Sequence, residues 1–180
     1  MTLFEYLTVG YSLIVSFAVL RALSGLPYIL RTTSRYWVHV AWVFLGLFGC
    51  LFVFWAFWRF REAEWTLPRY IIVLAVPALL YVHNSILVPS DPASVTSWRA
   101  HFFEVRVPLF MTACLMYTAA IIANYLLLDV SLSGMLTSWG LLGLSAAALA
   151  SANPRLHALL ALGPLLFAAA ALTLLARPDF

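Results

Sequence analysis

Apolar residues in this chain form long continuous runs, separated by short charged or Pro/Gly-rich breaks. A helix needs roughly 20 mostly apolar residues to cross about 30 Å of hydrocarbon, whereas barrel strands alternate polar and apolar residues over about 10 positions. We therefore expect an all-α integral membrane protein, a six-transmembrane-helix bundle that forms a single transmembrane domain over residues 1–180. The predicted spans are about 3–23, 36–60, 70–88, 107–128, 134–152 and 156–176.

The connectors between these runs are short, and the longest of them carries its own helix signal. Between the third and fourth spans, Asp91 is placed to cap a helix and Pro92 suits its first turn. Trp98 and Phe102 then supply an apolar side. We expect an interfacial helix here, running into the fourth span. The stretch after the first span, residues 24–35, is expected to be a connector lying along the membrane surface.

Composition agrees with a membrane environment. Of 180 residues, 64% are hydrophobic and 9% are charged, and the mean hydropathy of +0.98 excludes a separate soluble domain. The N-terminus carries Glu5 and no basic residue before the first apolar run, unlike a secretory signal peptide, so the first span is expected to remain in the mature protein. The net charge is +3 and no basic run exists, which excludes nucleic acid as a partner.

All ten basic residues are arginines, and their distribution predicts an orientation. We call the side that holds both termini face A and the other side face B. Because positive residues favour the cytoplasmic side, the excess on face B predicts that both termini lie outside, in a bacterial inner membrane. Face A receives Arg59, Arg61, Arg69 and Arg177, and face B receives Arg21, Arg31, Arg35, Arg99, Arg106 and Arg155.

A polar stripe runs along the first span. At 100° per residue, Glu5, Thr8, Ser12 and Ser16 fall within about an 80° sector. Such a stripe lines a wet pathway with Glu5 as its ionisable mouth, or it is a packing face whose hydroxyls bond the preceding turn or a neighbouring helix. The sequence leaves both interpretations open.

The stretch YVHNS, residues 81–85, interrupts the third apolar run near face B. On a helix, Tyr81, Asn84 and Ser85 share one side, while His83 points roughly the opposite way. A helix without a clean lipid face must be surrounded by protein or water. We therefore expect the third helix to be central and its face-B end to be the candidate site.

Alternating spans also bring the histidines together. His39 starts the second span, His83 nears the end of the third, and the other two lie in the third connector and at the start of the sixth span. Histidine is a proton carrier near neutral pH and a common metal ligand. The predicted face-B group is His39, His83, His101 and His157, and His101 and Glu104 share one helical side.

Three classes of function use these features. The expected one is a channel or small transporter that passes an ion or small solute, with the stripe of the first span and residues 81–85 as its walls. The second is a membrane redox or metal-binding protein, in which His39 and His83, at similar depth on antiparallel helices, ligate haem, or bind a metal ion with His101 and Glu104. The third is a non-catalytic assembly subunit.

Motifs for soluble catalysis are missing from the sequence, which contains no GxSxG, HExxH, phosphate-binding glycine loop or CxxCH. A channel is therefore expected rather than an enzyme, and the open alternative is a lipid-modifying enzyme that acts at the headgroup level through Arg99, His101, Glu104 and Arg106. The fifth and sixth spans are rich in Leu, Ala and Gly, and small residues let helices approach closely. We expect these spans to be scaffold and the protein to form a homo-oligomer in the lipid bilayer.

Overall fold

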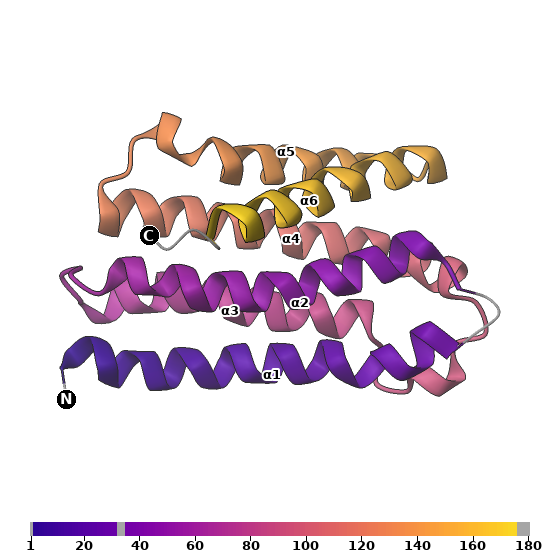
Figure 1. Ribbon diagram of the computed structural model, residues 1–180, viewed down its shortest axis with the longest axis horizontal. Coiled ribbons are helices and arrows are strands. Elements are labelled where there is room, and N and C mark those ends of the chain that lie inside the picture. The colour runs from indigo at the N-terminus through magenta and orange to yellow at the C-terminus, as the bar shows by residue number, and fades with distance from the viewer. Residues whose placement is uncertain (1, 32–34, 176–180) are drawn as a thin grey trace.

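The computed structural model describes residues 2–31 and 35–175, and within these ranges the regular structure is entirely helical (Figure 1). Three short 3-10 turns, η1 (Trp58–Phe60), η2 (Pro92–Ser94) and η3 (Leu132–Met135), lie in or beside the connectors. The α-helices are α1 (Leu3–Arg31), α2 (Trp37–Phe57), α3 (Leu67–Leu87), α4 (Trp98–Leu128), α5 (Leu136–Ala150) and α6 (Pro154–Leu175).

Four of these helices are long and apolar enough to cross a membrane, which fits a multi-pass membrane protein. They are α1 to α4, with α2 and α3 extended by the 3-10 turns that follow them. At 1.5 Å per residue, the 31 residues of α4 reach about 46 Å, whereas the 15 residues of α5 reach about 22 Å. The apolar parts of α5 and α6 are shorter than a normal span.

Neighbouring helices run antiparallel and form one bundle (Figure 1). Helix α1 packs on α2 and α3, α3 packs on α4, and α4 packs on α5. Helix α6 returns to contact α2 as well as α5. The start of α1 and the end of α6 lie toward the same end, face A, and the turns that join α3 to α4 and α5 to α6 lie at face B.

Helix α1 continues well past the predicted end of the first span. Residue 23 was expected to end it, with a surface connector over residues 24–35, but the helix runs to Arg31 through Pro27. Its last turns are held by packing, since Gly25 lies directly against Val88 and Ile29 is fully buried. The buried seam of α1 repeats at intervals of four and three residues and consists of Tyr11, Val15, Ala18, Ala22, Gly25 and Ile29.

The segment before the fourth span also differs from the prediction. The Oδ1 atom of Asp91 caps a turn as expected, accepting from the N–H of Ala93 at 3.2 Å, but this turn is the three-residue η2. A second cap follows, in which Ser97 Oγ accepts from the N–H of Ala100 at 3.3 Å. Helix α4 then runs unbroken from Trp98 past Pro108, so the segment expected as an interfacial helix is continuous with the fourth predicted span, and its place at the membrane interface stays a prediction.

Candidate functional site

Asn84 lies at the centre of the packing between α1, α2 and α3. Its side chain is fully buried, and Nδ2 donates to the carbonyl oxygen of Ala18 at 3.0 Å and to Sγ of Cys50 at 3.5 Å. The amide oxygen faces Gly46 of α2, where any side chain would collide with it. One polar residue of α3 therefore touches both neighbouring helices within the apolar part of the bundle.

The residues beside Asn84 carry buried polar atoms that lack partners. His83 is 5% exposed, and its ring interacts with the backbone of Leu109 on α4. Within the described part of the chain, Nδ1 of His83, Oδ1 of Asn84 and Oγ of Ser85 have no hydrogen-bond partner. Tyr81 is 42% exposed, so this one member of the predicted group lies on the outside of the bundle.

A second set of polar side chains lies around the start of α4. The ring of His39, at the start of α2, stacks on Trp98 with centroids 4.9 Å apart and meets His101 edge to face at 5.8 Å. His39 is fully buried, and both of its ring nitrogens are without partners in the described structure. Nε1 of Trp98 and Nε2 of His101 also lack hydrogen-bond partners among the described residues.

The remaining histidines also lie against the first half of α4. His157, in the first turn of α6, stacks on Phe110 at 5.5 Å and meets Phe102 edge to face at 5.4 Å. His83 approaches the same helix at Leu109. All four histidines therefore lie in or against the first half of α4.

His39 and His83 lie at different depths. Asn84 is level with Gly46, seven residues along α2 from His39, and seven residues span about 10 Å of helix. His83 precedes Asn84 directly and therefore lies deeper in the bundle than His39. The expectation of similar depth is not met, and the pair is not arranged as two axial haem ligands.

The geometry does not favour the alternative metal site either. His39 and His101 approach each other, but Glu104 is exposed and His83 lies deeper. No group of three or more His, Cys, Asp or Glu side chains that would suit a metal ion occurs among the described residues. The four proposed ligands are therefore not brought to one point.

The polar stripe of α1 satisfies its hydrogen bonds within the helix. Thr8 Oγ1 donates to the carbonyl of Phe4 at 2.7 Å, and the hydroxyls of Ser12 and Ser16 donate to carbonyls three and four residues earlier. The carboxylate of Glu5 accepts from the N–H of Thr2, and Oγ1 of Thr2 accepts from the N–H of Glu5. This reciprocal pair is a capping box. Because the hydroxyls of the stripe are hydrogen-bonded within their own helix, they favour the packing interpretation over the wet pathway.

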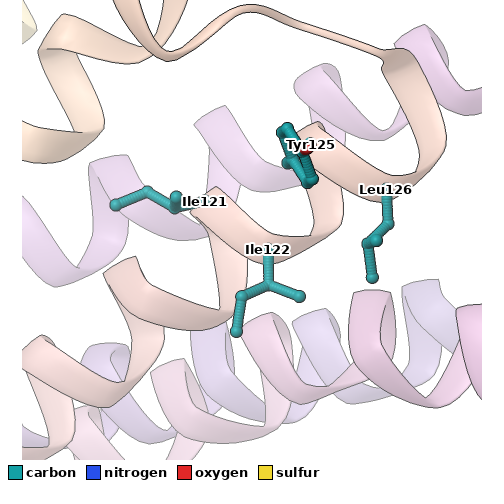
Figure 2. A pocket seen from close by; sticks show the side chains of 4 residues that line it. All are labelled: Ile121, Ile122, Tyr125 and Leu126. Atoms are coloured by element: carbon teal, nitrogen blue, oxygen red, sulfur yellow. The ribbon is translucent and has the colours of Figure 1, made fainter.

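Two open hollows lie on the outer surface of the bundle. One, of about 390 Å³, runs between α1 and α2 and includes Ser12, Ser16, Cys50 and Phe54. The other, of about 300 Å³, is lined by Ile121, Ile122, Tyr125 and Leu126 in the last turns of α4 (Figure 2). Both linings are largely apolar, so lipid chains are suitable neighbours for them.

A basic side chain holds the end of α5. Nη1 of Arg106 lies 3.1, 2.6 and 2.8 Å from the carbonyl oxygens of Ala148, Leu149 and Ser151. Nε2 of His157 donates to the same Ser151 carbonyl at 2.7 Å. Carbonyls at a helix C-terminus have no partners within the helix and carry partial negative charge, so Arg106 caps α5 electrostatically and His157 adds a hydrogen bond. This role was not predicted from the sequence.

Comparison with protein-family models, with curated proteins and with solved structures finds no match to this chain. The arguments about function therefore rest on the site itself.

Proposed function

We propose that this protein is a channel or small transporter that passes an ion or small solute through the bundle of α1 to α4. The observation that carries the proposal is the run of three consecutive residues on α3, His83 to Ser85, each with a buried polar atom that has no partner among the described residues. Water or a passing solute would supply the missing hydrogen bonds.

Buried polar groups without hydrogen-bond partners are energetically costly in an apolar bundle. A buried donor or acceptor without a partner costs about 1–3 kcal/mol. Polar and ionisable residues inside membrane helices are rare, and they usually mark pathways. Three adjacent unpartnered groups therefore weigh against a purely structural role. Oγ of Ser145, for comparison, is also buried but donates to its own helix at Leu141, 2.8 Å away.

The route is proposed to continue toward face B. Unpartnered ring nitrogens recur there on His39 and His101, about 10 Å beyond the level of Asn84 along the helices. The two sets lie against the same half of α4. The α1 stripe joins this route only at an interface between two copies, because Ser16 faces outward from the single chain. We accordingly keep the homo-oligomer as part of the proposal.

If His83 lies in the route, flux should depend on its protonation. A histidine takes up a proton as the pH is lowered, so flux is expected to change as the medium is acidified. Protonation places a positive charge in the route, and flux of a metal cation should therefore fall as the pH is lowered, whereas proton flux should rise. Proteoliposomes loaded with a cation-sensitive or a pH-sensitive dye measure the two cases.

His83→Ala is expected to abolish this pH dependence of flux. His101→Ala, at the more exposed end of the route, is expected to reduce the pH dependence without abolishing it. A pH profile of His83→Ala that superimposes on that of the parent protein would exclude His83 from the route.

The topology belongs to the same proposal. We propose that α5 and α6 also cross the membrane, despite their short apolar parts, and that the chain lies in a bacterial inner membrane with face A outside. Local thinning of the bilayer accommodates short helices at modest cost. A membrane-impermeant maleimide added to intact spheroplasts should label Glu62→Cys, on face A, but not Ala152→Cys, between α5 and α6. Labelling of both from outside would contradict six spans.

A further inference from the structure

We propose that face B binds the anionic headgroups of phospholipids through Arg35, Arg99 and Arg155. This interaction is independent of any transport activity. The observations that carry it are the unequal charge of the two faces, the pairing of the arginines, and the position of these three arginines in their helices.

The first observation is the charge difference. Among the side chains that the structure describes, face A has three arginines and four carboxylates, and face B has four arginines and two carboxylates. The face-B set consists of Arg35, Arg99, Arg106 and Arg155, with Asp91 and Glu104, whereas Arg21 lies ten residues before the end of α1. Face B is thus the more positive end of the bundle.

The second observation is that two of the three described arginines of face A form ion pairs within the protein, whereas three arginines of face B form none. On face A, Arg61 pairs with Glu62 at 3.1 Å and Arg69 pairs with Glu64 at 3.5 Å. On face B, the guanidinium groups of Arg35, Arg99 and Arg155 are exposed and have no ion pair or hydrogen bond within the described residues. They are available to an external anion.

The third observation concerns the helix starts. Arg35 precedes the first residue of α2 by two positions, and Arg99 and Arg155 are the second residues of α4 and α6. None of these three helices has an acidic residue in its first turn. A helix N-terminus carries partial positive charge, so cations are disfavoured there and anions are favoured. Three arginines at three such positions are not explained by the stability of the chain alone.

The three helix starts also converge. Tyr36 at the start of α2 and His157 at the start of α6 both contact Phe102 and Phe103 of α4, with ring centroids 5.4–6.1 Å apart. The three helix starts that carry these arginines therefore meet at one aromatic cluster. Aromatic rings prefer the headgroup level of a bilayer, where phosphate groups lie. The matching partner is an anionic phospholipid.

Native mass spectrometry of the detergent-solubilised protein, titrated with phosphatidylglycerol or phosphatidylcholine, tests the proposal. The triple variant Arg35→Gln/Arg99→Gln/Arg155→Gln should bind phosphatidylglycerol roughly 100-fold more weakly than the parent protein, from about fivefold for each arginine. The triple lysine variant should keep most of the affinity, because lysine retains the charge. The matched control is Arg59→Gln/Arg61→Gln/Arg69→Gln on face A, which should keep the parent affinity.

Several results would overturn the proposal. One is equal affinity for the two lipids in the parent protein, and another is an equal loss in the face-A control. Glycerol 3-phosphate provides the last comparison, because it carries the phosphate without acyl chains. If it binds as tightly as phosphatidylglycerol, the ligand is a free phosphate ester and not a membrane lipid. Weak binding of glycerol 3-phosphate, with tight binding of phosphatidylglycerol, supports the lipid.

Discussion

Gly46→Ala is expected to destabilise the bundle by about 2–4 kcal/mol, because the new methyl group meets the buried amide oxygen of Asn84. The end of a long side chain normally moves aside, but this amide is held on its other side by Ala18 and Cys50. Relieving the collision therefore breaks two hydrogen bonds or separates α2 from α3. The free energy of unfolding in a detergent titration measures the effect.

The control for this prediction is the same substitution at Gly140. That glycine lies in α5, and a methyl group added there would have no neighbouring atom within 4 Å. Removing a glycine from a helix interior stabilises the helix by about 0.5–1 kcal/mol. Gly140→Ala should therefore be neutral or slightly stabilising. Equal unfolding free energies for the two variants would contradict the close packing at Asn84.

Arg106→Met should cost about 3–5 kcal/mol, because it removes the donor that serves three carbonyl groups at the end of α5. Ala148 is buried and Leu149 and Ser151 are half-buried, so water replaces the lost donor only in part. Methionine keeps the length and most of the apolar volume of the arginine stem, so the variant isolates the lost hydrogen bonds. The α5–α6 hairpin is expected to detach first, which limited proteolysis of the connector 151–153 would detect.

Two further variants serve as controls for Arg106→Met. Arg106→Lys should recover part of the loss, since an ammonium group also donates hydrogen bonds and carries charge to the helix end. Arg59→Met, at an exposed site on face A, should change the unfolding free energy by no more than about 0.5 kcal/mol. If Arg106→Met unfolds like Arg59→Met, the carbonyl contacts contribute little to stability.

The helices themselves were largely predictable because hydrophobic runs of membrane length are a strong signal. Five of the predicted starts fall within three residues of an observed helix, and the exception is α4, which begins at Trp98 instead of residue 107. Polar residues such as Arg99 and Glu104 excluded that segment from a span, although they do not prevent a helix from continuing into the headgroup region. Whether the two short helices cross the membrane remains a proposal.

The extension of α1 could have been found from a different pattern. The prediction for α1 was based on the polar stripe that begins at Glu5. The face of α1 that packs on the bundle is a different one, which starts at Tyr11 and repeats every four and three residues to Ile29. A repeat that continues through Ser24 and Gly25 indicates helix even where Pro27 and small residues suggest a connector. The periodicity of the packed face was therefore more informative than the composition of the segment.

The candidate site was predictable in position but not in its contacts. The interruption of an apolar run by His83, Asn84 and Ser85 identified the region from the sequence. The partners of Asn84 could not be identified, because Ala18 and Cys50 are 66 and 34 residues away and contribute a backbone carbonyl and a thiol. The role of Arg106 was missed for the same reason, since its acceptors are backbone atoms 42 to 45 residues away.

In the proposed function, the unpartnered groups at His83 to Ser85 line a route through the bundle. The most direct test is a paired flux measurement in proteoliposomes, with protons and monovalent cations, on Ser85→Ala and Ser145→Ala. Each variant removes one serine hydroxyl whose oxygen is buried in the bundle. Only the hydroxyl of Ser145 has a partner within the described residues.

We expect Ser85→Ala to lower flux about fivefold, which is the effect of losing one hydrogen bond of about 1 kcal/mol, and to leave the unfolding free energy unchanged or higher. Ser145→Ala should keep the parent flux and lose a little stability. Parent-like flux in Ser85→Ala, or flux through the parent protein no greater than through protein-free liposomes for every ion tested, would contradict the proposed route.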